Sequence, residues 1–205
     1  MVSERVIGRL SLYRRILANL REDGQRSVFS HQLAVLAGCT PAQVRRDMMV
    51  LKTEGTPTRG YNIEKLLEAL DEILVGSEIR KVLLVGIGHL GRAVLSYFQD
   101  RQSNLVIAAA FDRDEAVTGR VISGCRCYTM DKLKEVIDSE DIRVAMLAVP
   151  ASGAQAVADM LIEMGIRGFL NFAPVHLKIN PPAYVEHVDI MTALERVIYF
   201  TQLKK

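Results

Sequence analysis

Three glycines and one aspartate carry the clearest chemical pattern in the sequence. Gly86, Gly88 and Gly91 stand at G-x-G-x-x-G spacing, and Asp112 follows roughly 20 residues after the last of them. The first glycine permits a tight turn, the second lets the backbone approach a pyrophosphate, and the third lets a helix pack against a strand. A carboxylate at the position of Asp112 accepts hydrogen bonds from ribose hydroxyl groups. The pattern therefore predicts a dinucleotide-binding site.

The charges at the end of this pattern bear on which nucleotide would bind. Asp112 would repel the 2′-phosphate of NADP, which favours NADH and NAD⁺ as the ligands. Arg113 weakens that preference, because an arginine beside the acid can pair with a phosphate. Two other interpretations stay open: the glycines serve only packing, or the crevice holds another nucleotide such as coenzyme A.

A strand, a helix and a second strand must position these residues. Residues 82–85 and 106–111 are apolar runs typical of buried strands, and residues 89–99 have apolar side chains at helical spacing. The N–H groups at the start of this helix, near His89 and Leu90, would hold the phosphates.

The alternation of strands and helices continues toward the C-terminus. Residues 144–149 and 168–171 read as strands, and residues 130–139 and 154–164 as helices. This order predicts a doubly wound parallel sheet with its ligand crevice at the carboxyl ends of the strands. Candidates for the nicotinamide side of the pocket lie at such ends: Val149, Pro150, Ala151, Asn171 and Phe172.

A helix-turn-helix pattern lies near the N-terminus. After an amphipathic helix over residues 4–22, Ser30 is expected to cap a short helix over 31–37, with Leu33 and Leu36 facing inward. A turn at Gly38 ends this short helix. The next helix starts in a capping box formed by three residues and is expected to continue to residue 55. The capping box consists of Thr40 at the N-cap, Pro41 at N1 and Gln43 at N3.

The start of the second helix of such a motif enters the major groove of DNA. Arg45 and Arg46 fall there, and the following GTPTRGYNI predicts a hairpin wing whose Arg59 contacts the backbone or the minor groove. The candidate DNA-binding residues are Thr40, Gln43, Arg45, Arg46, Lys52 and Arg59. The alternative is that the paired arginines form only a solvated helix face.

Charge is distributed unevenly along the chain. The residues before Tyr61 include ten basic and five acidic side chains, a net charge of +5, and because the whole chain carries +2 the remainder carries −3. A basic end beside an acidic remainder indicates a polyanion as partner of the N-terminal part.

The composition is that of an ordinary globular protein of 205 residues, 49% of them hydrophobic and 24% charged. No apolar run approaches the ~20 residues of a membrane helix, and the N-terminus lacks the apolar core of a signal peptide. Three cysteines are too few for a disulfide framework. We therefore expect a cytoplasmic protein with no membrane segment and no metal site, in which Cys125 and Cys127 are ordinary loop or core cysteines.

Several features argue against an enzyme. A nicotinamide dehydrogenase needs a substrate domain and a proton-transfer group near the hydride site, but only 55 residues follow Pro150. Tyr97 lacks a following lysine at the spacing of short-chain dehydrogenases, and the side chain of His89 is expected to face solvent. We expect a ligand sensor, with a small NAD(P)-dependent oxidoreductase and a coenzyme A-binding module as the alternatives.

Five stretches resemble one family closely. TPAQVRRD, VGIGHLGRA, VPASGAQ, LNFAPV and VEHVDI are similar to stretches of the Rex family of redox-sensing transcriptional repressors, and the resemblance covers essentially the whole chain. It implies a homodimer on a palindromic operator of double-stranded DNA. It also implies that NADH closes the dimer and releases the DNA, whereas NAD⁺ favours the DNA-bound form.

The resemblance also implies the organisation of the fold. We expect an α/β protein in three parts: a winged helix-turn-helix domain over residues 1–77, a Rossmann-type NAD(H)-binding domain over 78–188, and a C-terminal helix over 189–205 that is exchanged between subunits. Residues 191–202 are amphipathic, as such a helix requires.

A switch of three residues follows from the same resemblance. The family links an arginine, a tyrosine and an aspartate, which match Arg15, Tyr97 and Asp189 here. An ion pair between Arg15 and Asp189 of two subunits, made in one state and replaced by a tyrosine contact in the other, would couple the two sites. The chain departs from the family in MMVLK and TPTRGY, so the resemblance leaves the operator sequence open.

Overall fold

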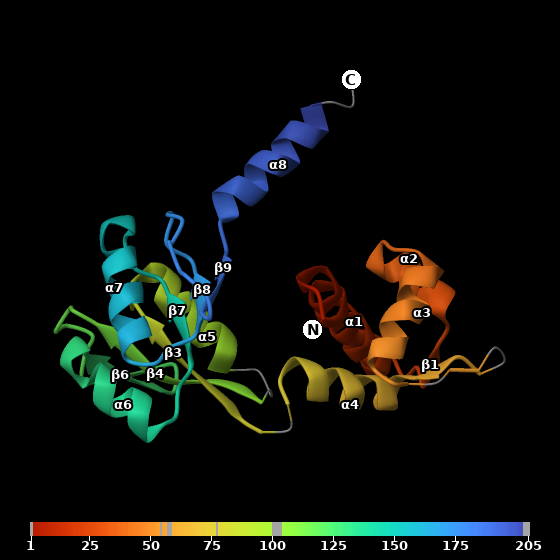
Figure 1. Cartoon of the computed structure of the whole chain (residues 1–205), viewed down its shortest axis with the longest axis horizontal. Helices are drawn as coiled ribbons and strands as arrows, with labels where there is room; N and C mark the ends of the chain where they lie inside the picture. Colours follow the sequence, from red (N-terminus) through yellow and green to blue (C-terminus); the bar gives the residue numbers. More distant parts are fainter. Residues whose placement is uncertain (1, 54, 57–58, 77, 100–103, 203–205) are drawn as a thin grey trace. The chain divides into compact units, whose positions relative to one another are not determined.

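The computed structural model describes residues 2–53, 55–56, 59–76, 78–99 and 104–202. The chain forms two compact units, Met1–Ile79 and Arg80–Lys205. In the part that the structure describes, the first unit is mainly helical and the second is built on a large sheet (Figure 1).

The first unit combines helices with a small antiparallel sheet. Its elements are α1 (Glu4–Glu22), β1 (Ser27–Val28), α2 (Ser30–Ala37), α3 (Pro41–Val50), β2 (Tyr61–Asn62) and α4 (Ile63–Leu74). Leu17, Leu33, Met48 and Leu70, one from each helix, belong to a single apolar core. α2 and α3 are the predicted helix-turn-helix pair, joined across Gly38, which has a φ of +63°.

The predicted wing is also present. β1 pairs with β2, and Thr56 forms a further antiparallel bridge with Gly60. Arg59 therefore stands next to the bridge that closes the wing, while Pro57 and Thr58 of the predicted hairpin lie outside the described residues.

Three local predictions in this unit were wrong. Phe29, not Ser30, is the N-cap of α2, because its N–H donates to Gln32 Oε1 at 2.9 Å. Leu36 is 54% exposed, since the inward face of α2 is centred on Leu33 and Ala34. α3 ends at Val50 and not at residue 55.

The second unit is a doubly wound sheet. Its elements are β3 (Arg80–Val85), α5 (His89–Gln99), β4 (Leu105–Asp112), β5 (Val121–Ile122), β6 (Cys125–Thr129), a 3₁₀ turn (Met130–Lys132), α6 (Leu133–Ser139), β7 (Val144–Leu147), α7 (Ala151–Glu163), β8 (Gly168–Asn171), β9 (Tyr184–His187) and α8 (Ile190–Gln202). The strand order is β5-β6-β4-β3-β7-β8-β9, and all neighbours are parallel except β5 and β6.

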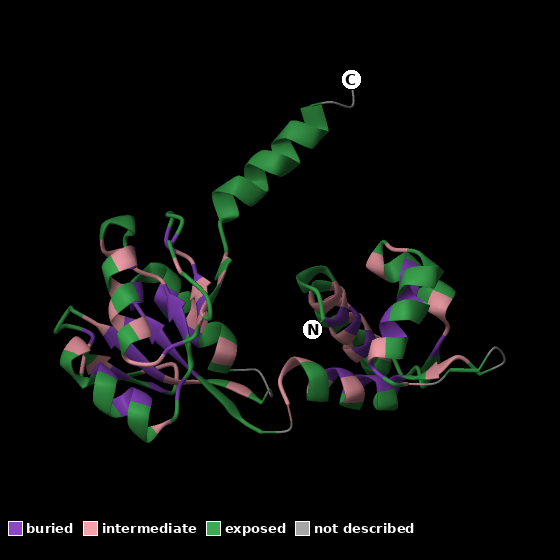
Figure 2. Ribbon diagram, in the orientation of Figure 1, coloured by how far each residue is buried: buried purple, intermediate pink, exposed green. Residues whose placement is uncertain are grey.

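Side chains of β3 enter two different cores, because successive residues of a strand point to opposite faces of the sheet. Leu83 and Val85 pack with α6 and α7, whereas Val82 and Leu84 pack with Leu95 of α5. Figure 2 shows the strands as the most buried part of this unit. The chain proceeds from β3 to one side of the sheet through β4 and β6, and to the other side through β7, β8 and β9. The carboxyl end of β3 is therefore the switch point at which such sheets bind ligands.

The predicted alternation of strands and helices is confirmed, although several elements differ from the prediction. β7 ends at Leu147 and not at residue 149. α7 begins at Ala151, three residues before the predicted start, so Ala151 opens a helix and does not end a strand. The helix predicted over 130–139 begins as a 3₁₀ turn before α6. The edge strand β9 was not predicted.

The last helix differs from the others in its exposure. No residue of α8 is buried, and Figure 2 draws its described length in the colour of exposed residues. Among the described residues, no helix has both the length and the apolar character that crossing a membrane requires.

Candidate functional site

A cavity of about 890 Å³ opens at the carboxyl ends of β3, β4 and β7. Nine of the residues that the sequence predicts for the cofactor line this cavity: Gly86, Gly88, His89, Leu90, Asp112, Arg113, Val149, Pro150 and Phe172. The four segments that contribute them lie at the carboxyl ends of four neighbouring strands, β4, β3, β7 and β8, so the sheet brings residues from distant parts of the chain together.

The glycines of the loop between β3 and α5 have different surroundings. Gly86 has a φ of +100°, and a Cβ atom there would collide with the carbonyl oxygen of Ala148. A Cβ atom at Gly91 would collide with the carbonyl oxygen of Gly86, so this glycine lets α5 pack against the turn. A Cβ atom at Gly88 would meet nothing within 4 Å, although Gly88 lines the cavity. Packing thus explains two of the glycines, and the third leaves open space where a ligand could approach the backbone.

Asp112 is held in place by the loop that it faces. Its Oδ2 accepts a hydrogen bond from the Ile87 N–H at 2.6 Å, and its Oδ1 accepts one from the Asp114 N–H at 3.0 Å. Because two carboxylate oxygens offer about four acceptor positions, Asp112 retains capacity for two hydroxyl donors. This arrangement fits a ribose at the end of β4.

Two cationic side chains line the same cavity. Arg113 was predicted from the sequence, whereas Arg92 was not. Arg92 follows Gly91 in the first turn of α5, and its N–H donates to the Gly88 carbonyl oxygen at 3.0 Å. The signal available in the sequence was its place in the first turn of the helix that the glycines open. Free N–H groups at that helix start and two guanidinium groups suit a pyrophosphate.

Three of the predicted cofactor residues lie outside the lining of this cavity. Gly91 packs beneath the loop, Ala151 is exposed at the start of α7, and Asn171 is buried with its side chain directed elsewhere. Asn171 Oδ1 accepts from the Ala173 N–H at 3.1 Å, and its Nδ2 donates to the Val175 carbonyl oxygen at 2.8 Å.

Asn171 also contributes to a second cavity of about 340 Å³, which His176, His187 and Asp189 line as well. The rings of the two histidines lie 4.1 Å apart, and Asn171 Nδ2 is 3.1 Å from His187 Nδ1. Burial, followed by the proximity of His176, lowers the pKa of His187 below 6.5. The lowered pKa favours the neutral form of His187.

The candidate DNA-binding helix, α3, begins in the predicted capping box. The Gln43 N–H donates to Thr40 Oγ1 at 3.2 Å, and Gln43 Oε1 accepts from the Thr40 N–H at 2.9 Å. Thr40 and Gln43 thus fix the helix start with their side chains. Arg45 and Arg46 are exposed on α3, and Arg45 Nη1 lies 3.4 Å from Ser30 Oγ.

The other two candidate DNA-binding residues lie beyond α3. Lys52 is exposed and lies after the end of α3, with a φ of +52°. Arg59 is exposed on the wing, where its N–H donates to Thr56 Oγ1 at 3.1 Å.

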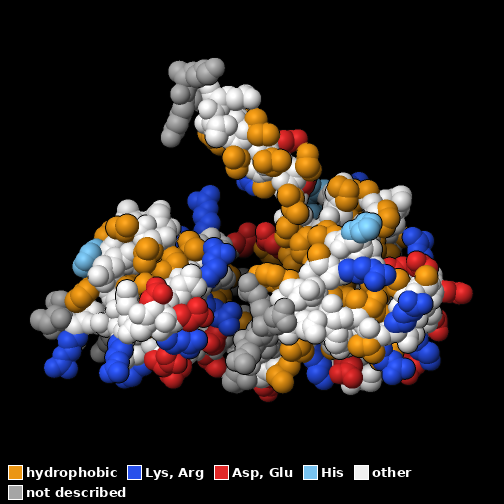
Figure 3. Space-filling model, turned by 180° about the vertical axis from the view of Figure 1, so that it is seen from behind, with side chains coloured by type: hydrophobic (Ala, Val, Ile, Leu, Met, Phe, Trp, Pro, Cys, Tyr) orange, Lys and Arg blue, Asp and Glu red, His pale blue; other side chains and the backbone are white. Residues whose placement is uncertain are grey.

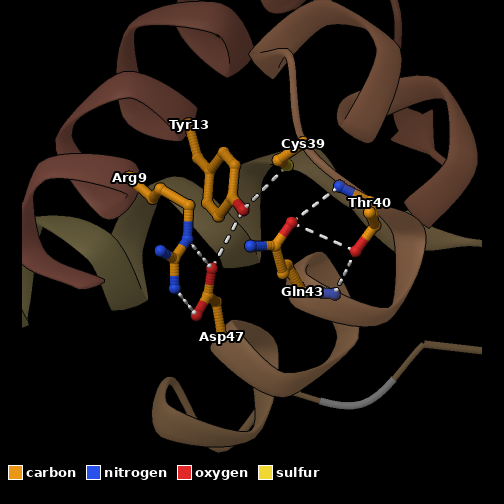
Figure 4. A network of polar contacts seen from close by, with 6 residues as sticks. All are labelled: Arg9, Tyr13, Cys39, Thr40, Gln43 and Asp47. Atoms are coloured by element: carbon orange, nitrogen blue, oxygen red, sulfur yellow. Dashed lines mark hydrogen bonds and ion pairs between the residues drawn. The ribbon is translucent and has the colours of Figure 1, made fainter. Parts of the chain in front are cut away.

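A buried carboxylate on α3 was missed by sequence reasoning. Asp47 is 1% exposed and accepts two hydrogen bonds from Arg9, at 2.7 and 2.8 Å, and one from the Tyr13 hydroxyl at 2.9 Å (Figure 4). The Tyr13 hydroxyl also lies 3.4 Å from Cys39 Sγ, at the turn before α3. The available signal was spacing, because Asp47 shares the inward face with Val44.

This network shifts the pKa values of its members. Burial alone would raise the pKa of Asp47, but the hydrogen bonds from Arg9 and Tyr13 and the charge of Arg9 bring it below 3.8. Burial raises the pKa of Tyr13 above its usual range, and the hydrogen bond to Asp47 raises that of Arg9. A charged Arg9 and a charged Asp47 therefore join α1 to α3 at neutral pH.

The three residues of the predicted switch lie on two units. Arg15 is exposed on α1 of the first unit, and Tyr97 is 56% exposed on α5 of the second. Asp189 caps α8: its Oδ1 accepts from the N–H groups of Met191 and Thr192 at 2.9 and 3.1 Å. These bonds, from Thr192 first, lower the pKa of Asp189.

Cys125 and Cys127 are buried, and the side chains that could bind a metal ion form no suitable cluster among the described residues. Burial raises the pKa of Cys125 to about 12, and it also raises that of the buried Cys127. Within the described ranges, no three His, Cys, Asp or Glu side chains gather in a way that could hold a metal ion.

Two family models match the chain. The model described as "Putative DNA-binding protein N-terminus" matches residues 1–48, and the model described as "CoA binding domain" matches residues 77–175. These matches agree with the division into a helix-turn-helix unit and a nucleotide-binding sheet.

Whole-length relatives are more informative. The chain is 36% identical to the redox-sensing transcriptional repressor Rex of Lactobacillus acidophilus over 96% of this chain and 93% of that one. It is 38% identical to the Rex of Geobacillus kaustophilus over 94% of this chain and 90% of that one.

Among solved structures, the chain is similar to RSP, a Rex-family repressor, with a TM-score of 0.89 at 28% identity, covering all of this chain and 96% of that one. A second structure of RSP holds NAD⁺ and operator DNA, and it matches with a TM-score of 0.88 at 29% identity over all of this chain and 97% of that one. A third holds NADH, with a TM-score of 0.86 at 28% identity over all of this chain and 99% of that one.

Proposed function

Because the chain belongs to the Rex family of redox-sensing transcriptional repressors, we propose that it binds operator DNA through the first unit and NADH or NAD⁺ in the cavity of the second. The bound cofactor sets the affinity for DNA. The protein is thus a repressor that responds to the ratio of NADH to NAD⁺.

One observation supports this function most directly. The 890 Å³ cavity is lined by a phosphate loop whose Gly88 leaves open space, and by Asp112, whose carboxylate is oriented by the same loop. The same chain carries a capped helix with two exposed arginines, Arg45 and Arg46. A dinucleotide site and a DNA-reading helix in one chain are the parts that a redox-sensing repressor needs.

The direction of the response comes from the solved relatives. RSP holds NAD⁺ in its structure with operator DNA, and another structure of RSP holds NADH. We propose accordingly that NAD⁺ accompanies the DNA-bound form of this protein, and that NADH closes the protein and releases the DNA. This requires that NADH bind the DNA-free form more tightly than the DNA-bound form.

The active form is a homodimer on a palindromic operator. Support for this comes from α8, where several large apolar side chains are exposed, and Figure 3 shows orange side chains on the projecting helix. These side chains are Ile190, Met191, Leu194, Val197, Ile198, Tyr199 and Phe200. A helix with so much exposed apolar surface needs a partner surface, and we propose that a second copy of the chain supplies it by exchange of α8. The three parts are then residues 1–77, 78–188 and 189–205.

The two sites are coupled through Arg15, Tyr97 and Asp189. Asp189 is the residue immediately before α8, so a change in the position of this helix moves the carboxylate of Asp189. An ion pair between Arg15 of one subunit and Asp189 of the other in one state, exchanged for a contact with Tyr97 in the other state, supplies the difference in contacts that coupling requires.

Coenzyme A is the second candidate ligand, because the family model matching residues 77–175 is described as a CoA-binding domain. Its adenosine carries a 3′-phosphate on the ribose, where Asp112 would meet it with a like charge. NADP, with a 2′-phosphate, meets the same repulsion. The relatives are repressors, so we assign no enzymatic reaction to the cavity. We place the protein in the cytoplasm, where a bacterial repressor meets its operator.

The function is tested by fluorescence anisotropy of a labelled duplex that the protein itself selects from a random library. NADH, NAD⁺ and coenzyme A are titrated separately at one fixed salt concentration, since contacts to phosphates make the affinity salt-dependent. We expect NADH to lower the DNA affinity about 100-fold, which corresponds to ~2.7 kcal/mol of coupling. Release by coenzyme A and not by NADH, or no selected duplex at all, would overturn the proposal.

A further inference from the structure

Met49 is the most exposed large apolar residue of α3, with 77% of its surface accessible. At 100° per residue, Ala42, Arg45, Arg46 and Met49 fall within an arc of roughly 100° on this helix, and all four are exposed. Met49 lies between the two arginines in this projection. The outward stripe of α3 thus places one apolar side chain among cationic ones.

The orientation of this stripe is fixed by the opposite face of the helix. Asp47 is anchored to Arg9 of α1 by two hydrogen bonds and to Tyr13 by a third (Figure 4). A helix held in this way cannot rotate to bury Met49. Met49 is therefore exposed as a consequence of how α3 packs in the first unit.

The chemistry of the stripe indicates what covers it. Arg45 and Arg46 flank Met49 and attract a polyanion, and in the major groove the apolar group on a base edge is the C5-methyl of thymine. We propose that Met49 contacts a thymine methyl group in the operator and is a specificity-determining residue. This inference rests on the proposed function, in which α3 enters the major groove.

The dimensions are compatible with this contact. Met49 lies one helical turn beyond Arg45, ~6 Å along the axis at 1.5 Å per residue. Base pairs follow each other at about 3.4 Å, so the two side chains would reach positions about two steps apart. A methionine side chain is long, flexible and polarisable, so it can adjust its conformation to make contact with a methyl group.

The test uses uracil, which is thymine without the methyl group. A duplex selected by the wild-type protein from a random library is synthesised with uracil in place of thymine, one symmetric pair at a time. At the pair of thymines that Met49 contacts, we expect each uracil to lower the affinity of the wild type about four-fold, which corresponds to ~0.8 kcal/mol for one methylene-sized group. Because each half of the operator contributes one such contact, the loss for the pair is about 15-fold. Met49→Ala should bind the thymine and uracil duplexes equally at that pair.

Val35→Ala is the matched control. Val35 is also an exposed apolar residue, with 81% of its surface accessible, but it lies on the neighbouring helix α2. This variant should keep the full sensitivity to uracil. Equal sensitivity of Met49→Ala and the wild type would overturn the inference, and so would a wild type indifferent to uracil at every thymine. A changed oligomeric state of Met49→Ala with unchanged uracil sensitivity would assign Met49 to a protein contact instead.

Failure of the proposed function gives a different result. Replacing Arg45 and Arg46 by Ala should abolish binding to the selected duplex if α3 enters the groove, and should leave the NADH dissociation constant unchanged. If these arginine variants bind as the wild type does, α3 is not the DNA-binding helix. If they lose binding while uracil has no effect, the function stands and the role of Met49 falls.

Discussion

At the scale of single residues, Asp47 shows how an acidic side chain can serve a basic helix. It is buried on the inner face of α3 and receives hydrogen bonds from Arg9 and Tyr13. Its charge is neutralised inside the unit by Arg9, so the arginines on the outer face of α3 remain available for an external anion. The ion pair thus serves orientation as well as stability.

Replacing Arg9 by Met should destabilise the first unit by about 3 kcal/mol, because it leaves a buried carboxylate without its cation. This is the low end of the range for such changes, since 26% of the Arg9 side chain is accessible. Denaturant unfolding of the full chain measures the change. Arg5→Met, at an exposed position of the same helix, is the control and should cost little. A cost below about 1 kcal/mol for Arg9→Met would contradict this role.

His187 should make the stability of the second unit depend on pH. Its folded pKa is lowered below 6.5, so the unfolded chain takes up its proton first as the pH falls. The stabilisation is fully present above pH 6.5 and is lost as the pH falls from there through the folded pKa. Protonation would also place an N–H of His187 against the Asn171 Nδ2 donor. Unfolding at about pH 8 and about pH 5.5 should show a larger loss for the wild type than for His187→Asn; equal losses would exclude His187 as the cause.

At the scale of elements, the turn between β3 and α5 separates packing from binding. Gly91→Ala should destabilise the second unit by about 3 kcal/mol, because the new methyl group collides with the Gly86 carbonyl oxygen. Gly88→Ala should fold normally, since its new methyl group meets only open space, but should weaken NADH binding about ten-fold or more. Thermal unfolding and an NADH titration of both variants test this contrast. Unchanged NADH affinity of Gly88→Ala would place the pyrophosphate elsewhere.

Elements whose signals are local could be predicted from the sequence. The bounds of α1, α5 and β8 agree with prediction, and the capping box of α3 was recognised because its residues are near neighbours in the chain. The edge strand β9 was not predicted, since Tyr184–His187 becomes a strand only by pairing with β8.

The positions of site residues at the ends of strands could be predicted from the sequence, whereas the orientations of their side chains could not. Asn171 ends β8 as expected, but its amide is oriented by Ala173 and Val175, which no pattern in the sequence reveals. The partnership of Arg9 and Asp47 spans 38 residues and depends on how the fold brings α1 and α3 within reach of each other. Long-range contacts of this kind need the fold.

At the scale of the whole molecule, Asp189 has two roles in the proposed switch: it carries a negative charge, and it caps α8. Two variants separate these roles. Asp189→Ala should bind NADH but release DNA weakly, and it should also lose about 1 kcal/mol of helix stability. Asp189→Ser keeps a capping oxygen without the charge, so it should recover the helix and still respond weakly. Paired titrations of NADH in the absence and presence of DNA measure the response. Full release of DNA by Asp189→Ser would remove the charge of Asp189 from the mechanism.

Cys125 and Cys127 lie buried on β6 with raised pKa values, so they stay protonated and poorly nucleophilic at neutral pH. Peroxides and electrophiles act on thiolates, and the sensing unit offers them little to react with at these positions. The protein would therefore respond to the oxidation state of the nicotinamide pool and not to oxidants as such. A burst of oxidant that spares this pool would pass unregistered by these two cysteines.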